Sequence, residues 1–209
     1  MNLTNPISAV SPGGRGVILS VLARTTEPLS GRRIAELAGG QLGKTRAIEV
    51  LGELAAAGIV LVESRPPALL YQLNRDHLAA DAICQLADLR STLIEQMRSH
   101  LDGWECAPVT AWLFGSAARG DGTDSSDIDI AVVRPEGLDA DEVVWSAQLV
   151  EFSDAIARWT GNETNVIEYS EVEISELHRA GEPILESIQA EGIHLAGRSR
   201  LISSRVAAR

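Results

Sequence analysis

Two short motifs in residues 109–133 bring together side chains that can do chemistry. The first is Gly115-Ser116, which ends the apolar run VTAWLF and precedes a helix start, AAR. A strand that breaks into a helix leaves free backbone N–H groups, and such a turn suits a phosphate. We expect Gly115 to let the backbone approach a nucleotide's phosphate closely, and Ser116 to donate its hydroxyl.

The second motif is Asp127-Ile128-Asp129, which opens a second apolar strand. Side chains alternate along a strand, so both carboxylates lie on one face. Two carboxylates so placed form an oxygen-rich site for a hard cation, Mg²⁺ above all. With Mg²⁺ on this pair and the triphosphate of an NTP on the Gly-Ser turn, the site would suit nucleotidyl transfer, which is the activity that the two motifs predict.

The two motifs together resemble the DNA polymerase β superfamily of nucleotidyltransferases, and in particular its minimal, MNT-type members. The shared pattern GSxARG…SDIDxxV stands here as residues 115–120 and 126–129, and the resemblance extends over about residues 104–197. It implies a mixed sheet with flanking helices, and Arg119 as a basic partner for phosphates or nearby carboxylates. A structural ion pair of Arg119 with Asp121 or Asp124 is the equal alternative.

The resemblance also implies a third carboxylate on a later strand, which helps to hold the metal and accepts a proton. The matching strand is TNVIEY, where Asn165 stands at the expected aspartate position. An asparagine can coordinate through its carbonyl but cannot take a proton. Glu168 faces the opposite side of a regular strand, yet a bulge or register shift would bring it inward. Glu168 is therefore our candidate for the substitute catalytic carboxylate.

Helices and strands must hold these motifs in place. The stretch DADEVVWSAQLVEFSDAIARWTG predicts a long helix whose aromatic residues Trp145, Phe152 and Trp159 pack in a core. Trp112, within the apolar strand, is also expected in the core.

The N-terminal third has a different pattern: two short helices, a turn, a third helix and a hairpin around Arg65-Pro66-Pro67. This order resembles the winged helix-turn-helix domains of bacterial regulators, in which the third helix enters the major groove of DNA. The resemblance implies contacts to duplex DNA from exposed residues of three segments. They are Lys44, Thr45 and Arg46 (with Glu49 on the same face), Arg65 at the wing tip, and Arg32 and Arg33 as phosphate contacts.

The distribution of charge fits this division. The net charge is -11, but residues 1–75 hold eight Lys and Arg against five Glu, whereas residues 76–197 hold six Arg against 24 acids. A basic N-terminal third favours a polyanionic partner, which the acidic remainder would repel. The alternative is that the winged helix docks a protein or forms a dimer and has no role on DNA.

The sequence thus predicts an α+β chain of five segments: a flexible tail (1–13), a winged helix-turn-helix (14–75), a connecting helix (76–103), a nucleotidyltransferase domain (104–197) and a basic tail (198–209). No apolar run approaches the ~20 residues of a membrane span, and no signal peptide is visible. Two cysteines, Cys84 and Cys106, exclude a disulfide framework. We expect a cytoplasmic protein without membrane contact.

Two functions follow as expectations. In the first, the chain is a Mg²⁺-dependent enzyme that transfers a nucleotide from NTP to a hydroxyl of a protein, an RNA or a small molecule, with the winged helix recruiting or regulating. In the second, it is a DNA-binding regulator whose transferase fold senses nucleotide or forms a homodimer. The intact Gly-Ser and Asp-x-Asp motifs favour the enzyme, and Asn165 favours the regulator.

Overall fold

The computed structural model describes residues 1–199 and divides the chain into two compact units. The N-terminal unit comprises Asn2 and Thr4–Arg90, and the C-terminal unit comprises Met1, Leu3 and the chain from Ser91 onward. Each unit has its own apolar core. The last segment predicted from the sequence, the basic tail 198–209, lies outside the described residues except for its first two.

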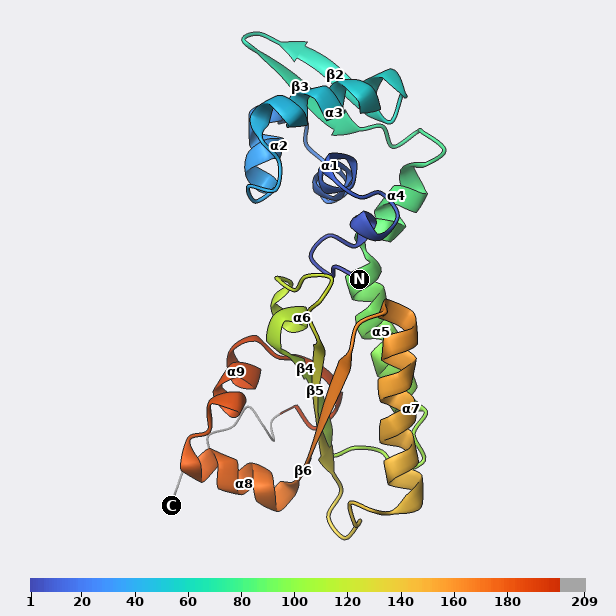
Figure 1. Cartoon of the computed structure of the whole chain (residues 1–209), viewed down its shortest axis with the longest axis vertical. Helices are drawn as coiled ribbons and strands as arrows, with labels where there is room; N and C mark the ends of the chain where they lie inside the picture. The colour runs from blue at the N-terminus through green and yellow to red at the C-terminus, as the bar shows by residue number, and fades with distance from the viewer. Residues whose placement is uncertain (200–209) are drawn as a thin grey trace. The chain divides into compact units, whose positions relative to one another are not determined.

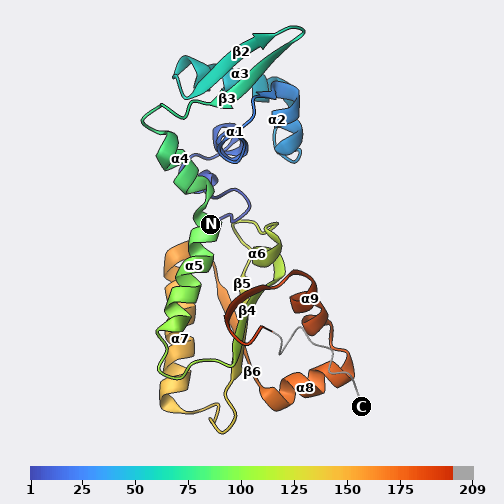
Figure 2. The same ribbon diagram turned by 180° about the vertical axis from the view of Figure 1, so that it is seen from behind.

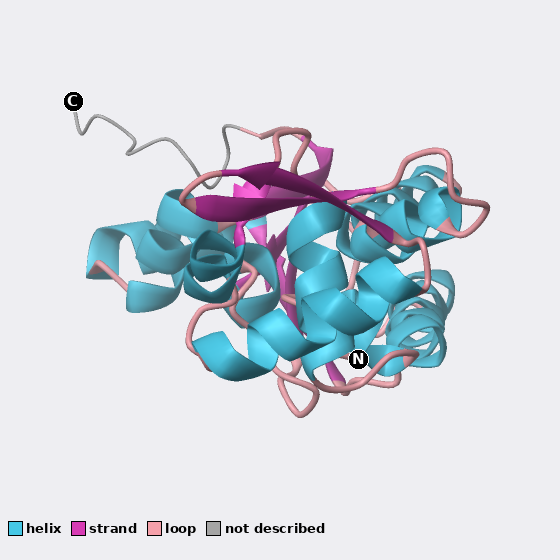
Figure 3. Cartoon of the chain, turned by 90° about the horizontal axis from the view of Figure 1, so that it is seen from above, coloured by secondary structure: helices cyan, strands magenta, loops and turns pink. Residues whose placement is uncertain are grey.

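The N-terminal unit contains helices and one small antiparallel sheet of order β1-β3-β2. In chain order its elements are η1 (Pro6–Ala9), α1 (Gly14–Ala23), β1 (Leu29–Ser30), α2 (Gly31–Leu37), α3 (Lys44–Ala56), β2 (Val60–Arg65), β3 (Ala68–Leu73) and α4 (Ala80–Ala87). The strands β2 and β3 form a twisted ribbon along one side of the helices (Figures 1 and 3).

Local sequence explains how these helices begin and pack. Ser30 caps α2, its hydroxyl accepting a hydrogen bond from the Arg33 backbone N–H, and serine is among the residues that helix N-termini prefer at this position. Apolar residues at helical spacing on α3, among them Ala47, Leu51 and Leu54, are buried in the core. Ile48 lies at the same helical spacing, but its side chain is 45% exposed.

Two expectations about this region are wrong. Residues 1–13 were predicted to be a flexible tail, but Pro6–Ala9 form a turn of 3₁₀ helix and Ile7 is fully buried in the N-terminal core. Residues 76–103 were predicted to be one connecting helix, but the helix is interrupted at Asp88. The segment before the break, α4, packs in the N-terminal core, so it belongs to that unit rather than to a connector.

The C-terminal unit is a four-stranded mixed sheet with helices on both faces (Figures 1 and 2). Its elements are α5 (Leu89–Asp102), β4 (Thr110–Phe114), α6 (Gly115–Arg119), β5 (Ile128–Arg134), α7 (Val143–Thr160), β6 (Thr164–Ser170), α8 (Glu171–Ala180), α9 (Pro183–Glu191) and β7 (Ile193–Gly197). The strand order is β6-β5-β4-β7; β5 and β6 are parallel and the other pairs are antiparallel.

The central strand β4 is buried along its whole length because helices cover both faces of the sheet. One face packs against α5 and α7, with Met97, Trp145 and Phe152 fully buried. The other packs against α8 and α9 through Ile174 and Leu185. Trp112 is in the core, as predicted, but Trp159, also predicted to be core, is 37% exposed.

This architecture is the α+β arrangement that the sequence predicts for the C-terminal part, a mixed sheet with flanking helices. Within residues 1–199, no helix combines the length and the apolar character that a membrane span requires.

Candidate active site

The first site element is the turn at the end of β4. Gly115 has φ +69°. This backbone conformation is unfavourable for any residue that carries a side chain. A Cβ placed on Gly115 would lie 2.7 Å from Asp129 Oδ2, which is closer than any real Cβ contact. Gly115 is therefore required for two reasons, the backbone conformation and the close approach of the Asp129 carboxylate to the turn.

Ser116 follows in the same turn. Its backbone carbonyl accepts hydrogen bonds from the N–H groups of Gly120 (2.9 Å) and Asp121 (3.2 Å), at the C-terminal end of α6. Its hydroxyl forms no hydrogen bond with any other residue between 1 and 199, and it lies near Gly122, where a Cβ would be 3.2 Å away. The Ser116 hydroxyl is therefore available to donate to a ligand.

The two aspartates lie where β5 begins. Asp127 directly precedes the strand and Asp129 is its second residue. The parallel register places Asp129 beside Asn165 of β6, so these two side chains share one face of the sheet. The Asn165 amide Nδ2 lies 3.2 Å from Asp127 Oδ2 and 3.2 Å from Asp129 Oδ1, and donates a hydrogen bond to each. Asp127, Asp129 and Asn165 thus form one cluster beside Gly115.

Glu168, the candidate for the substitute carboxylate, is not part of that cluster. The strand β6 pairs with β5 in unbroken register, without the bulge that would turn Glu168 inward. Because side chains alternate, Glu168 lies on the opposite face from Asn165. There it forms an ion pair with Arg134, and both side chains are largely buried. Its carboxylate neutralises that arginine.

Arg119 has acidic partners already. Its guanidinium binds Asp121 (Nε–Oδ2 2.9 Å) and Glu191 of α9 (Nη1–Oε1 2.6 Å). These hydrogen bonds, the one to Asp121 first, raise the pKa of Arg119 above its ordinary value. Of the two interpretations of Arg119, the structure shows the ion pair, with Glu191 as a partner that the sequence did not suggest. A phosphate would have to compete with both carboxylates.

Asn162 is a residue that sequence reasoning missed. It is buried, and its amide Nδ2 donates hydrogen bonds to the backbone carbonyls of Ser126 (2.9 Å) and Asp124 (3.4 Å). These bonds fix the loop that leads into Asp127. The only sequence signal was a lone asparagine after the glycine that ends α7, which is common in turns.

The charges around the cluster are mainly negative. Asp121, Asp124, Asp127 and Asp129 all lie in or next to the loop between α6 and β5. Within residues 1–199, no group of three or more His, Cys, Asp or Glu side chains is placed to hold a metal ion. Protein ligands for a cation here are thus two carboxylates and the Asn165 amide. A triphosphate would need accompanying cations, because Arg119 alone cannot offset this negative charge.

The residues predicted to contact DNA are exposed, but most of their charges are paired. Arg32 and Arg33 both bind Glu36 (2.8 and 3.3 Å). Arg46 binds Glu49 and Arg65 binds Glu63 (3.0 and 2.7 Å). The hydrogen bonds from Arg32 and Arg33 lower the pKa of Glu36, and the bond from Glu63 raises that of Arg65. Among the described residues Lys44 has no ion pair, and Thr45 is exposed beside it.

The match to a protein family concerns the C-terminal unit. Residues 104–201 match the family model described as "Polymerase beta, Nucleotidyltransferase". No curated protein matches the chain.

Among solved structures, a chain from a mutant of the toxin-antitoxin MntA-HpeT is 18% identical, with a TM-score of 0.37 over 53% of this chain and 80% of that chain. A toxin-antitoxin with AMP-PNP is 20% identical, with a TM-score of 0.34 over 54% and 79%. A second MntA-HpeT mutant is 21% identical, with a TM-score of 0.34 over the same shares.

Proposed function

We propose that the protein transfers a nucleotide from NTP to a hydroxyl acceptor, and that it binds duplex DNA through its N-terminal unit. The match of residues 104–201 to the polymerase beta nucleotidyltransferases supports the first part of this proposal. The observation that carries the transferase proposal is the convergence of Asp127, Asp129 and Asn165 beside the Gly115 turn. Hydroxyl acceptors on a protein, an RNA or a small molecule all fit this proposal.

The donor set suits Mg²⁺, which proteins bind through one or two carboxylates together with phosphate oxygens of the substrate. Asp127 and Asp129 would hold the ion. Asn165 could add its amide oxygen, since rotation of the amide exchanges Nδ2 and Oδ1. Bound there, Mg²⁺ would withdraw charge from the α-phosphate and offset the charge of the pyrophosphate.

The residues of the chain divide the remaining work. The Ser116 hydroxyl and the N–H groups of the turn would donate to the phosphates and orient them. Gly115 keeps Asp129 close to that turn, and Asn162 holds the loop that positions Asp127. Asn165 takes no proton at neutral pH, so the acceptor hydroxyl must lose its proton to another group or to water. We therefore expect slow transfer.

The direct test is incubation of the full-length protein with Mg²⁺ and each of the four NTPs, labelled on the α-phosphate. Incorporation of label into the protein or an added acceptor, with release of pyrophosphate, supports transfer. Tight NTP binding without pyrophosphate release would exclude the enzyme under these conditions and favour the second candidate. That candidate is a regulator with an inactive, nucleotide-sensing fold, and the observation in its favour is Asn165 at the third-carboxylate position.

Asn165→Asp is expected to raise the rate of transfer, because it supplies a third carboxylate beside Asp129. General-base contributions are typically 10²-fold or more, so we expect at least about a tenfold increase in pyrophosphate release. Glu168→Gln should leave the chemical step unchanged, since Glu168 lies on the opposite face, and should lower thermal stability by leaving Arg134 without its partner. A Glu168→Gln variant that is fully folded but inactive would contradict this placement.

The DNA-binding part of the proposal rests on the N-terminal unit. The order α1, β1, α2, α3, β2 and β3, with β1 added to the hairpin, fits a winged helix-turn-helix. Its candidate recognition helix, α3, begins with the exposed residues Lys44, Thr45 and Arg46. The glutamates that pair with the arginines reduce the positive charge presented to DNA, which predicts modest affinity.

Lys44→Ala and Arg46→Ala should each weaken binding of the full-length protein to duplex DNA. Each lost phosphate contact should reduce the slope of log affinity against log salt by about one. Glu36→Gln should strengthen binding, because it releases Arg32 and Arg33 from their shared carboxylate. A gel-shift titration over several salt concentrations, with duplexes from the promoter of the protein's own gene, measures all three. If DNA binding is equal in all variants, α3 is not the contact surface.

A further inference from the structure

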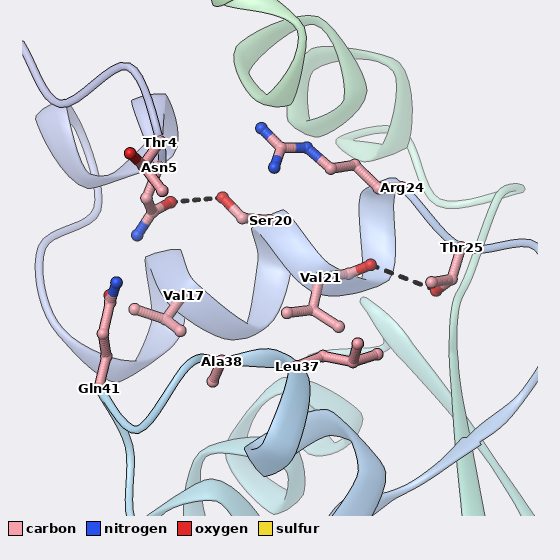
Figure 4. Close-up of a pocket in the computed structure, with 10 residues that line it drawn as sticks. All are labelled: Thr4, Asn5, Val17, Ser20, Val21, Arg24, Thr25, Leu37, Ala38 and Gln41. Carbon is pink, nitrogen blue, oxygen red and sulfur yellow. Dashed lines mark hydrogen bonds between the residues drawn. The ribbon is translucent and has the colours of Figure 1, made fainter. Parts of the chain in front are cut away.

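A pocket opens in the N-terminal unit between α1 and the C-terminal end of α2 (Figure 4). Its volume is about 230 Å³. Val17 and Val21 of α1 form one apolar wall, and Leu37 and Ala38 form the other. Leu37 is 43% exposed, so its apolar surface is open to an occupant. None of the proposed nucleotide or DNA contacts lines this pocket.

The polar rim of the pocket offers hydrogen-bond donors. Asn5 is 94% buried, and its Oδ1 accepts a hydrogen bond from the Ser20 hydroxyl (Figure 4). This bond fixes the amide orientation, so Nδ2 is the atom left for other partners. Within residues 1–199, that Nδ2 donates to no protein acceptor. The Gln41 side chain, also on the rim, likewise forms no hydrogen bond within the described chain.

Arg24 places a positive charge beside these donors. Its Nη2 donates to the Ala87 carbonyl (3.2 Å), and it makes no ion pair with any carboxylate among residues 1–199. No acidic residue lines the pocket. Burial, and after it the charge of Arg24, lower the pKa of the nearby Arg90. Arg24 thus brings a positive charge to the pocket, whereas Arg32, Arg33, Arg46 and Arg65 are paired with glutamates.

We propose that this pocket binds a small carboxylate with an apolar body. The apolar part would lie between α1 and Leu37, and the carboxylate would accept hydrogen bonds from Arg24 and Asn5. An apolar pocket with a few converging polar groups is the usual form of a small-molecule site. The volume suits a short hydrocarbon body. Such a ligand would contact the segment that joins α2 to α3, and thereby the helix proposed to bind DNA.

Titration calorimetry of the full-length protein with octanoate, octan-1-ol and octylammonium tests the charge preference. We expect octanoate to bind at least tenfold more tightly than octan-1-ol, and octylammonium not at all, since hydrogen bonds to charged groups are the stronger ones. Equal affinity for octanoate and octylammonium, or no binding of octanoate at millimolar concentration, would overturn the proposal.

Variants separate the pocket from the rest of the surface. Arg24→Gln should weaken octanoate at least tenfold, whereas Arg24→Lys should retain much of the affinity. Leu37→Glu should abolish octanoate binding, since it adds a carboxylate to the pocket wall. Ile48→Glu is the matched control, an equally exposed apolar residue outside the pocket. Circular dichroism establishes that each variant is folded. If folded Leu37→Glu and Ile48→Glu bind octanoate alike, the ligand lies elsewhere.

Discussion

Asp129→Asn is expected to reduce nucleotide transfer by at least about 10²-fold. Asp129 is the carboxylate closest to the Gly115 turn and one of only two carboxylates in the cluster with Asn165. Charge stabilisation by a bound cation is worth several kcal/mol, and each ~1.4 kcal/mol is a factor of ten in rate. Asp127→Asn should have a comparable effect. Pyrophosphate release from Mg·NTP measures both variants.

The fold should survive these substitutions, because Asp127 is exposed and asparagine has the shape of aspartate. Asp124→Asn is the matched control, since Asp124 lies in the same loop and the hydrogen bond from Asn162 goes to its backbone. If Asp127→Asn and Asp129→Asn both keep wild-type turnover and Mg·NTP affinity, the carboxylate cluster is not the active site.

Gly115→Ala is the second substitution with a large expected effect. The added methyl would meet Asp129 Oδ2 at 2.7 Å, so either the turn or the carboxylate must move. A displacement of about 1 Å in a reacting group can cost on the order of 10²-fold in rate. Because alanine is strained at this positive φ, the substitution should also lower the free energy of unfolding by roughly 1–2 kcal/mol. Transfer assays and thermal denaturation measure the two effects separately.

Gly137→Ala separates backbone strain from the contact. Gly137 also has a positive φ, +83°, but a Cβ there would meet no atom within 4 Å. Both variants should lose a similar amount of stability because of backbone strain. Only Gly115→Ala should also lose transfer activity. Equal activity of the two variants would mean that the approach of Asp129 to the turn is unimportant for transfer.

The chemistry-bearing part of the site was predictable because strand periodicity alone places Asp127 and Asp129 together. Aligning one strand placed Asn165 at the position of the expected third carboxylate, and the register of β6 puts this residue beside Asp129. The face on which Glu168 lies stayed open because sequence cannot say whether a strand contains a bulge. Glu191 of α9 could not be predicted as a partner of Arg119, because it lies far away in sequence and only tertiary packing brings it close.

The helices and the hairpin of the N-terminal unit were predictable from caps and apolar spacing, such as Ser30 before α2. The wrong predictions concern residues whose burial or helix boundaries are determined by tertiary contacts. Ile7 is buried by packing against residues distant in sequence, which a short polar segment with Pro and Gly does not indicate. The interruption at Asp88 had no local signal either, since the apolar pattern continues from α4 into α5.

The sheet topology also sets an order of events during synthesis. The central strand β4 pairs with β5, which follows soon after it, and with β7, whose residues 193–197 are made much later. Pairings between distant segments form slowly because loop closure costs entropy. By then all of the N-terminal core, which ends at Ala87, has left the ribosome. The nascent chain must therefore carry Trp112 and Phe114 partly uncovered until β7 and α9 emerge, and during this interval it is exposed to aggregation and to chaperones.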